Sequence, residues 1–459
     1  MMRFPFRKYK ENPGKTAGPY EKIRERMLIF VGTMNESVMK TVLVVGSGGR
    51  EHAIVDALSR SSQVGKIYCA PGNAGIAAQA ECVPLKDTQV EELLAFAQEK
   101  QVDLTVVGPE VSLSAGIADA FRAAGQRIFG PSKAAARIES SKDFAKGLMA
   151  RHGVPTAAYR TFDAYDEALE YVRGGSFPVV LKYDGLAAGK GVVIPEDFES
   201  ARTALKDMLL DDKFGKGKVV VEEFMTGPEF SFLCFVDGVT VVPMVLSQDH
   251  KRAYDGDKGP NTGGMGAYTP LPFITEEDRQ DALEHIMKPV AAALVEEGCP
   301  FRGVLYGGLM KTPQGIKVVE FNCRFGDPET EVVLPRLQSD IYDVFRATAD
   351  GTLAALPPLR WSDEAVLGIV LASKGYPGSY EKGAEIEGLE EAAALPGVRI
   401  YHMGTKRQDG KTVTAGGRVL MAVAQAPTLP EANARALQAV AAIRCEGLFH
   451  RTDIGHQAL

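Results

Sequence analysis

A continuous apolar run near the start of the chain constrains the fold more than any other feature. Residues 41–45 read Thr-Val-Leu-Val-Val, and the glycine-rich turn 46–49 follows at once. A strand without polar alternation is buried on both faces, which is typical of a parallel sheet covered by helices. Apolar residues then recur at helical spacing over residues 53–58. The sequence therefore predicts a strand, a glycine turn and a helix.

The same alternation continues to about residue 139. Short apolar runs are separated by stretches with helical spacing, which predicts a parallel α/β sheet. Ligands bind such sheets at the carboxyl ends of the strands. The predicted strands are 67–69, 104–107 and 127–129, and the predicted helices are 88–99 and 114–124. The loops at the carboxyl ends, rich in small residues, are 46–50, 70–75 and 108–110.

A second region runs from about residue 140 to 350, and it mixes helices with antiparallel strands. A strand at 178–182 ends in Lys182, and the glycine-rich loop 184–191 follows. The further elements expected are a helix at 140–152, strands at 218–224, 229–236 and 239–246, a helix at 275–297, and a hairpin of 304–311 with 316–322. Pro357-Pro358 marks a boundary, and residues 360–459 predict an α+β domain.

Composition excludes several classes of protein. The chain has 459 residues, 45% of them hydrophobic, and a net charge of −7. No apolar run approaches the ~20 residues that cross a bilayer, so we expect no membrane span. The negative charge disfavours nucleic-acid binding. The six cysteines are scattered without a CxxC pair, which removes support for a zinc ribbon and fits a reducing cytoplasm.

The first 38 residues are basic and lack sustained periodicity. Their apolar stretch, 27–31, is too short for a secretory signal and follows the charges. Their glutamates argue against an organelle transit peptide. We expect residues 1–38 to be a disordered extension, with Met39 as the natural start because a strand begins directly after it.

The first glycine turn suits an anion better than a dinucleotide. A dinucleotide fingerprint needs a third glycine where Glu51 stands, and the acidic residue expected after the second strand is missing. Glycines still let the backbone approach an anion, and the following helix directs free N–H groups at it. A phosphate or carboxylate of a small substrate would suit the turn. The alternative is a tight turn without a ligand.

The loop between Lys182 and Lys190 predicts a polyphosphate site. Lys182 at a strand end projects a fixed cation, and Lys190 adds charge within the glycine-rich loop. The loop is not a Walker A motif, because the chain contains no GxxxxGK[ST] string. The alternative, a solvated hairpin turn, is weaker because two lysines bracket so many small residues.

Glu222 and Glu223 end an apolar strand on opposite faces, so only one can face a given cleft. A carboxylate at a strand end can accept hydrogen bonds from ribose hydroxyls, and Glu229 is a second candidate. The alternative is a pair of surface acids.

Glu320-Phe321-Asn322 is the strongest local signal. Residues two apart on a strand share a face, with Phe321 on the other. A carboxylate and an amide oxygen are ligands that Mg²⁺ accepts while it keeps water and phosphate oxygens. Arg324, just after, would supply a planar fork for a phosphate or carboxylate. The alternative is a hairpin end with solvated polar residues.

Residues 247–266 form the longest polar, glycine-rich stretch. A loop of this length without secondary structure is usually a functional lid or a linker. His250 lies in this stretch, but its charged surroundings disfavour an acid–base function.

Six segments together resemble the phosphoribosylamine–glycine ligase (glycinamide ribonucleotide synthetase) family of the ATP-grasp superfamily. The likeness runs in order from about residue 39 to Asp453-Ile454-Gly455. The segments are 46–53, 70–75, 184–191, 247–252, 259–266 and 320–329. Each is modest alone, but six in register are highly specific.

The resemblance implies a pre-ATP-grasp parallel-sheet domain at 39–139, an ATP-grasp core at 140–355 with a small lid at about 158–224, and a C-terminal domain at 360–459. The implied reaction joins glycine to 5-phosphoribosylamine in de novo purine (IMP) synthesis. It consumes ATP through glycyl phosphate and gives glycinamide ribonucleotide, ADP and phosphate. We expect a monomeric cytoplasmic enzyme without nucleic-acid or membrane partners.

The resemblance also assigns site residues. Glu320 and Asn322 would hold Mg²⁺ or Mn²⁺, and Arg324, Lys182 and Asp257 would be catalytic. The ATP contacts implied are Lys142, Lys182, Lys190, Glu222, Phe224 and Glu229. The substrate contacts implied are Gly48, Gly49, Arg50, Glu51, Gly72, Asn73, Gly108, Pro109, Glu110, Asn261 and Arg324.

Tyr183 departs from the alanine common in the family, and Pro228 and Phe230 flank Glu229 unusually. Three alternatives stay open at this point: a related carboxylate–amine ligase with another amine, a nicotinamide dehydrogenase using the first turn, and a noncatalytic nucleotide sensor.

Overall fold

The computed structural model describes residues 39–185, 191–211, 213 and 215–459. Residues 40–459 form one compact unit. The predicted extension 1–38 and the candidate ATP ligand Lys190 lie outside the described residues. None of the described helices combines the length and apolar character that crossing a bilayer requires.

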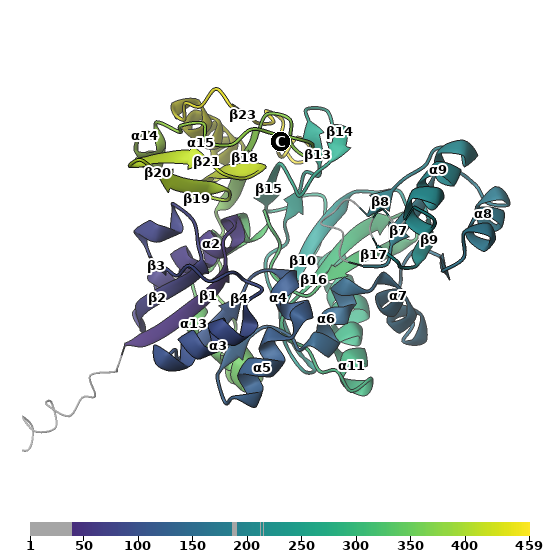
Figure 1. The fold of residues 1–459 in the computed structure, drawn as a ribbon, viewed down its shortest axis with the longest axis horizontal. Helices are drawn as coiled ribbons and strands as arrows, with labels where there is room; N and C mark the ends of the chain where they lie inside the picture. Colours follow the sequence, from purple (N-terminus) through teal and green to yellow (C-terminus); the bar gives the residue numbers. More distant parts are fainter. Residues whose placement is uncertain (1–38, 186–190, 212, 214) are drawn as a thin grey trace, which may run out of the picture. The chain divides into compact units, whose positions relative to one another are not determined.

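The N-terminal part contains the predicted parallel sheet, with strand order β3-β2-β1-β4-β5 (Figure 1). Central strand β1 is buried on both faces, as its apolar run predicts, and Val42 to Val45 are fully buried. The strands are β1 (Lys40–Gly46), β2 (Val64–Pro71), β3 (Glu81–Cys82), β4 (Leu104–Val107) and β5 (Ile128–Phe129).

The helices of this part begin and end close to the predicted positions, with one exception. The helix expected at 114–124 is two helices, because Gly116 adopts a φ of +95° between them, a conformation that favours glycine. The helices are α2 (Gly49–Ser59), α3 (Val90–Glu99), α4 (Glu110–Ala115) and α5 (Ile117–Ala123), with the 3-10 turn η1 (Ile76–Ala78).

A small four-stranded sheet of order β6-β9-β7-β8 follows, and two helices cover one of its faces (Figure 1). This unit has its own hydrophobic core, which includes Phe162, Leu181 and Leu205. Its elements are β6 (Tyr159–Phe162), α8 (Tyr165–Arg173), β7 (Val179–Tyr183), β8 (Val192–Val193), α9 (Phe198–Leu209) and β9 (Val219–Glu223). Helices α6 (Lys133–Ser140) and α7 (Lys142–Arg151) precede it.

The next sheet, which we call the central sheet, is antiparallel with order β11-β10-β16-β17. It contains the predicted hairpin. A register shift sets Gly308 opposite Glu320 but Leu309 opposite Val318, so Val319 is the extra residue of a β-bulge. The strands are β10 (Glu229–Asp237), β11 (Thr240–Pro243), β16 (Arg302–Thr312) and β17 (Gly315–Asn322). The helices are α10 (Glu276–Ala282), the π-helix η2 (Leu283–Met287), α11 (Lys288–Glu296), α12 (Thr330–Val333), η3 (Leu334–Arg336), α13 (Ile341–Asp350) and η4 (Leu353–Ala355).

Four phenylalanines from different elements pack where the N-terminal sheet and the central sheet meet. The ring of Phe345 on α13 lies 4.5 Å from that of Phe129 on β5. Phe325, in the loop after β17, lies 6.2 Å from Phe129 and 6.0 Å from Phe235 on β10, centroid to centroid. Ring pairs at these distances stabilise beyond their buried area. This aromatic cluster fixes the loop on either side of Phe325.

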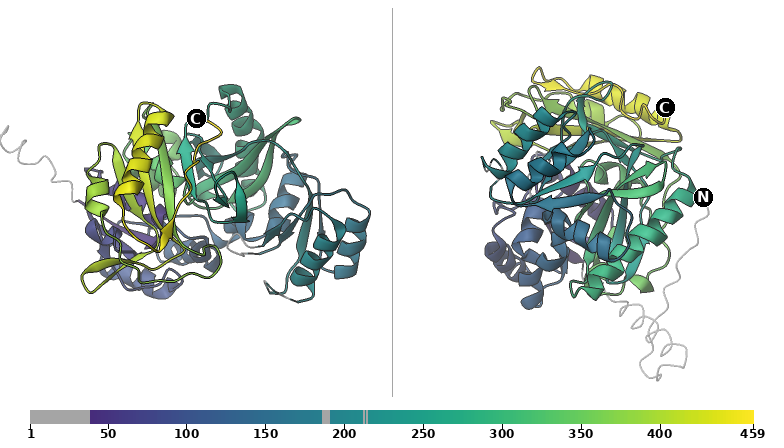
Figure 2. Two further views of the ribbon diagram at one scale, coloured as in Figure 1. Left: turned by 90° about the horizontal axis from the view of Figure 1, so that it is seen from above. Right: turned by 90° about the vertical axis from the view of Figure 1, so that its right-hand side faces the viewer.

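The C-terminal sheet takes two strands from the middle of the chain. Its order is β12-β15-β18-β22-β19, β23 also pairs with β18, and α15 packs on one face (Figure 2). Its strands are β12 (Gln248–Asp249), β15 (Gly266–Thr269), β18 (Ala365–Ser373), β19 (Val398–His402), β22 (Arg418–Ala426) and β23 (Leu448–Phe449). The other elements are α14 (Leu389–Ala393), β20 (Thr405–Gln408), β21 (Lys411–Thr414) and α15 (Leu429–Ala442).

The expectation of a long structureless loop at 247–266 is therefore wrong. This stretch contains β12 and a short hairpin, β13 (Arg252–Tyr254) with β14 (Lys258–Asn261), and it leads into β15. Strands of two to four residues are too short to establish an alternating pattern, and their glycines conceal them. In addition, β15 pairs with β18, which lies about a hundred residues later in the sequence.

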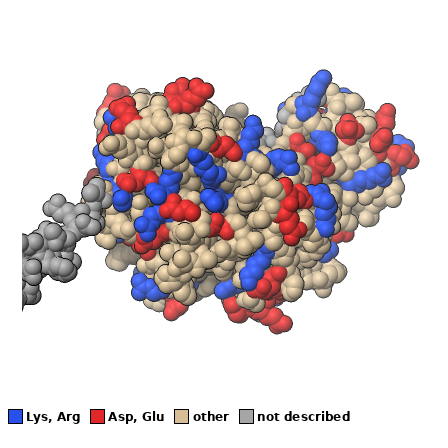
Figure 3. Space-filling model, turned by 90° about the horizontal axis from the view of Figure 1, so that it is seen from below, with Lys and Arg blue, Asp and Glu red and all other residues tan. Residues whose placement is uncertain are grey.

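Charges of both signs are mixed on the face that Figure 3 draws. Lysine and arginine side chains are interspersed there with aspartate and glutamate, and no broad field of one sign forms. The cations that matter for the candidate site are instead buried, as the next subsection describes.

We expect Phe345→Ala to lower the free energy of unfolding by about 3–5 kcal/mol, because it removes a fully buried ring and leaves a cavity. Chemical denaturation followed by fluorescence would measure the change. Val239→Ala is the control, because Val239 is 66% exposed and its truncation should cost under ~0.5 kcal/mol. A loss below about 1 kcal/mol for Phe345→Ala would contradict this role of the cluster.

Candidate active site

The glycine turn after β1 is built around the carboxylate of Glu51. The Gly48 N–H donates to Glu51 Oε2 at 2.6 Å, and Arg50 Nε donates to Glu51 Oε1 at 2.6 Å. A side chain at Gly108 would overlap this carboxylate. Glu51 and Arg50 are both almost completely buried. The glycines at the strand ends are thus needed to admit the protein's own carboxylate.

Asp327 lies at the N-terminus of α2, where the sequence predicts an anion. Its Oδ2 is 3.5 Å from the N–H of Arg50, and its Oδ1 is 2.8 Å from Nη2 of Arg418. Arg418 Nη1 also donates to the carbonyl of Gly263 at 2.8 Å. A helix N-terminus stabilises a carboxylate in this place. Here the anion is a protein side chain that joins the turn to the C-terminal sheet.

Arg418 was not found by the sequence reasoning. It begins β22, about ninety residues after Asp327 in the sequence, and no motif connects the two. Only the pairing of C-terminal strands brings it here.

Arg324 connects the end of β17 to two helices of the N-terminal part. Its Nη2 donates to Glu139 Oε1 at 3.0 Å, and its Nε is 3.4 Å from Glu110 Oε2. Burial alone would lower the pKa of Arg324, but Glu139 and Glu110 raise it. Arg324 therefore stays charged, and Glu110 is held ionised in return, with a lowered pKa. Glu139, which the sequence reasoning missed, also accepts from the Cys323 N–H at 2.8 Å.

Glu320 and Asn322 share one face of β17, as predicted, and Phe321 is buried on the other. Glu320 makes no hydrogen bond or ion pair with any residue that the structure describes. Asn322 Oδ1 accepts one bond from Arg324 Nη2 at 3.3 Å. Burial would raise the pKa of Glu320, but four nearby cations lower it, so the carboxylate is ionised. These cations are Lys182, Lys251, Lys142 and Arg324.

This donor set fits a hard divalent cation with few protein ligands. It offers one ionised carboxylate and one amide oxygen, two positions apart on a rigid strand. Within residues 39–185, 191–211, 213 and 215–459, no cluster of three or more His, Cys, Asp or Glu forms a metal cage. Mg²⁺ bound beside phosphates uses one or two protein ligands and completes its octahedron with other oxygens.

Two lysines share one carboxylate oxygen close to the strand that bears Glu320 and Asn322. The Nζ atoms of Lys182 and Lys146 each lie 3.0 Å from Glu222 Oε2. Lys182 Nζ also donates at 2.8 Å to the carbonyl of Val319, the bulged residue of β17. All three side chains are almost completely buried, while Glu222 Oε1 is buried without a hydrogen-bond partner among the described residues. The two cations and this free oxygen form a polar cluster inside the fold.

Burial lowers the pKa of Lys146 to about 8; Glu222 opposes the shift and Lys182 adds to it. The sequence reasoning missed Lys146, although a signal was present. Lys142 and Lys146 are four positions apart on α7, so they share a helix face. Lys142 Nζ donates to the carbonyl of Gly185 at 3.3 Å, beside the described edge of the glycine-rich loop.

Phe224 and Glu229, predicted at the nucleoside, lie at strand ends near this cluster. Phe224 directly follows β9 and is 42% exposed. Glu229 begins β10, with Oε2 3.6 Å from Lys251 Nζ. Tyr183, the departure from the family pattern, is buried, and its ring packs where side chains at Gly185 and Gly217 would clash with it.

Asp257 and Asn261 lie in a different environment. Asp257, in the turn of the β13–β14 hairpin, pairs with Arg451 Nη1 at 2.9 Å and His456 Nε2 at 3.3 Å. Asn261 is exposed on β14. Among the described residues, neither contacts Arg324, Glu320 or Asn322. Asp257 belongs to a contact between the hairpin and the end of the chain, whereas Asn261 pairs with Arg252 of β13.

His250 is a structural residue in this fold. Its Nε2 accepts from the Gly455 N–H at 3.2 Å, and burial together with Arg451 lowers its pKa to about 4. The imidazole is therefore neutral at pH 7.

Gly72, Asn73 and Pro109 shape the loops at the carboxyl ends of the sheet. Asn73 Nδ2 donates at 2.8 Å to the carbonyls of both Ser47 and His402, and its Oδ1 accepts two backbone N–H groups. A side chain at Gly72, whose φ is +71°, would overlap Cys82 Sγ. Pro109 precedes the first residue of α4, Glu110. The Asn73 amide thus uses its hydrogen-bonding capacity within the protein.

Three family descriptions match consecutive parts of the chain. The phosphoribosylglycinamide synthetase N domain matches residues 40–139, the ATP-grasp (A) domain 140–330, and the C domain 366–457. The chain belongs to the phosphoribosylglycinamide synthetase family.

Similar proteins agree with this membership. A phosphoribosylamine–glycine ligase from Halalkalibacterium halodurans is 51% identical over 420 residues, covering 91% of this chain and 97% of the relative. The crystal structure of phosphoribosylamine–glycine ligase from Thermotoga maritima has a TM-score of 0.79 at 32% identity, covering 90% of this chain and 100% of that one. N5-carboxyaminoimidazole synthase from Aspergillus clavatus, solved with ADP and 5-aminoimidazole ribonucleotide, shares the fold with a TM-score of 0.64 at 16% identity, covering 88% and 98%.

The resemblance read from the sequence is confirmed, as is the fold class of a parallel-sheet domain, an ATP-grasp core and a C-terminal α+β part. The family is one of ATP-dependent carbon–nitrogen ligases in purine biosynthesis, and the chain is an enzyme of this type. A nicotinamide dehydrogenase is thereby excluded.

We expect the affinity for Mg·ADP to fall about tenfold between pH 7 and 9.5. Lys146 is charged below its pKa of about 8 and loses its proton as the pH rises through that value. This removes one of the two positive charges beside Glu222 and weakens the attraction of the cluster for phosphates. Calorimetric titration at several pH values measures the change. In Lys146→Arg, which stays charged, the affinity should vary less than threefold; the same tenfold fall in this variant would exclude Lys146 as its source.

Proposed function

We propose that this enzyme joins glycine to 5-phosphoribosylamine, with ATP and Mg²⁺ or Mn²⁺, and releases glycinamide ribonucleotide, ADP and phosphate. The observation that carries the proposal is the Arg324 cluster. It joins the strand that bears Glu320 and Asn322 to Glu110, at the carboxyl end of the parallel sheet. A nucleotide site and a small-substrate site would therefore adjoin at this guanidinium.

In this proposal the phosphates of ATP contact Lys142 and Lys182, with Lys190 from the glycine-rich loop. Lys146 supports Lys182 through their shared partner Glu222. The free oxygen of Glu222, together with Phe224 and Glu229, contacts the nucleoside. Glu320 and Asn322 would hold the metal ion, which would offset phosphate charge as a Lewis acid.

The chemistry requires activation of the glycine carboxylate, because oxide is a very poor leaving group. A carboxylate oxygen attacks the γ-phosphorus, the bond to the bridging oxygen breaks, and ADP leaves. The amine of phosphoribosylamine then attacks the carbonyl carbon of glycyl phosphate, and phosphate leaves with the carboxylate oxygen. The protein mainly positions the reactants and neutralises charge. The buried, permanently charged Arg324 is suited to the acyl phosphate.

The remaining substrate contacts come from the loops around Arg324 and Asp327. Gly48, Gly49 and Gly108 make room for the carboxylates of Glu51, Asp327 and Glu331 at the edge of the site, while Arg50, Glu51 and Glu110 set the local charge. Gly72, Asn73 and Pro109 hold the loops in shape. Asp257 and Asn261 would join the site only if the β13–β14 hairpin moved toward Arg324, since Asp257 now pairs with Arg451 and Asn261 with β13.

We also propose that residues 158–224 act as a lid over the nucleotide within an ATP-grasp core of 140–355, between domains at 39–139 and 360–459. The separate core of the β6–β9 sheet supports a unit that moves as a body. Closure would protect glycyl phosphate from water.

The decisive assay is ADP release by the purified enzyme with Mg²⁺ and ATP. We expect release that requires glycine and phosphoribosylamine together, and no release when other amino acids or amines replace them. Release with a different carboxylate–amine pair would assign the enzyme to a related ligase. ATP binding without any ADP release would support the nucleotide sensor.

We expect Glu320→Ala to lose at least about a thousandfold in turnover at saturating Mg²⁺ while folding normally, because a metal ligand at the transferred phosphoryl group is removed. Initial-rate kinetics and circular dichroism measure the two effects. Glu364→Ala is the matched control, since Glu364 is an exposed carboxylate outside the site. Turnover within tenfold of the parent would remove Glu320 from the metal site.

A further inference from the structure

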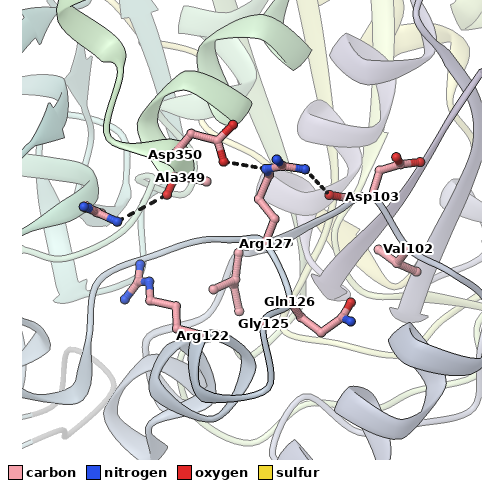
Figure 4. A pocket seen from close by; sticks show the side chains of 10 residues that line it. Val102, Asp103, Arg122, Gly125, Gln126, Arg127, Ala349 and Asp350 are labelled. Carbon is pink, nitrogen blue, oxygen red and sulfur yellow. Dashed lines mark hydrogen bonds and ion pairs between the residues drawn. The ribbon is translucent and has the colours of Figure 1, made fainter. Parts of the chain in front are cut away.

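A cavity of about 490 Å³ lies beside the N-terminal sheet (Figure 4). It lies where β4 and β5 begin, whereas the substrate loops follow the ends of the parallel strands. Its lining comes from the end of α5, the segments that lead into β4 and β5, the start of β16 and the end of α13: Val102, Asp103, Arg122, Gly125, Gln126, Arg127, Ile128, Arg302, Ala349 and Asp350.

Two of its three arginines have carboxylate partners. Arg127 Nε lies 2.5 Å from Asp350 Oδ1, and Nη1 donates to the Asp103 carbonyl at 3.2 Å. Arg302 is held more loosely, with Nε 3.5 Å from Asp237 Oδ1 and Nη1 3.4 Å from the Ala349 carbonyl. Asp237 does not line the cavity. The Arg302 guanidinium therefore keeps N–H groups that can donate hydrogen bonds to a further partner.

Arg122 has no ion pair with any residue that the structure describes. Its Nη2 donates to the carbonyl of Gly130 at 2.5 Å, and its side chain points into the cavity (Figure 4). Burial lowers the pKa of Arg122, and the charge of Arg302 lowers it further, while Asp119 opposes the shift without forming an ion pair. Two guanidinium groups that repel each other across a cavity are both stabilised by an anion between them.

We propose that this cavity binds the phosphoryl group of a small metabolite between Arg122 and Arg302. Each planar guanidinium can give two parallel hydrogen bonds to phosphate oxygens. A phosphate dianion matches the charge of two arginines that face the same space. A carboxylate carries a single charge, which one guanidinium already neutralises. The volume is in the range of small-ligand pockets, ~300–1,000 Å³, and the polar lining suits a charged ligand.

The site is separate from the proposed catalytic site. Strand β4 leads from the cavity at Asp103 to Gly108, and its four residues span roughly 13 Å. Strand β16 leads from Arg302 to Gly308, opposite Glu320, over roughly 20 Å. A ligand here would touch both the N-terminal sheet and the central sheet, and it would not compete with ATP.

The test is calorimetric titration of inorganic phosphate into the full chain saturated with Mg·ADP. We expect Arg122→Met to bind one phosphate fewer than the parent, and Arg122→Lys to keep the site with affinity about tenfold lower, because the charge stays but the fork is lost. Arg202→Met is the matched control, because Arg202 is an exposed arginine on α9, and it should equal the parent.

An unchanged stoichiometry in Arg122→Met would overturn the proposal, and so would an equal loss in Arg202→Met. Malonate in place of phosphate distinguishes the anion: tighter Arg122-dependent binding of malonate would overturn the phosphoryl assignment. Thermal denaturation and ligase turnover within twofold of the parent show that Arg122→Met is folded; if it is not, the Arg122→Lys result decides. A failure of the ligase assay would leave this binding result unaffected.

Discussion

The buried guanidinium of Arg324 is the constraint on which the site depends. A charge removed from water needs close partners of opposite sign, and removing one partner is costly. Glu110 begins α4, Glu139 lies in α6, and Asn322 ends β17, so satisfying one cation fixes three elements against one another. The packing of Phe325 beside it then restricts the loop that continues to Asp327. The positive charge of Arg324 therefore both stabilises the fold and serves the proposed chemistry.

A second ion pair, between Arg418 and Asp327, holds the C-terminal part at the candidate site. Arg418 contacts Asp327 and the segment at Gly263 and Gly264, which leads directly into β15 of the C-terminal sheet. Because β12 and β15 are strands of that sheet, the middle of the chain cannot shift without it. The C-terminal part thus supplies a cation to the loop that follows β17.

Sequence patterns predicted those elements whose signal lies within a short stretch of neighbouring residues. The apolar run before Gly46 predicted the parallel sheet, and the spacing of Glu320 and Asn322 predicted their shared face. Patterns could not predict partners brought together by tertiary packing, such as Arg418 with Asp327, Glu139 with Arg324, or Lys146 with Glu222. The bulge at Val319 was missed because it depends on the exact register of β16 and β17, which an apolar pattern does not define. The strands inside 247–266 were missed because they are only two to four residues long. The resemblance supplied Asp257, which the fold places with Arg451 instead.

The account rests on activation of a carboxylate by phosphoryl transfer beside Glu320 and Arg324. The most direct measurement uses glycine labelled with ¹⁸O in both carboxylate oxygens, with unlabelled ATP and phosphoribosylamine. The account predicts one ¹⁸O atom in each phosphate released, detected by mass spectrometry, and one retained in the amide carbonyl. Phosphate without the label, formed along with the amide product, would contradict it.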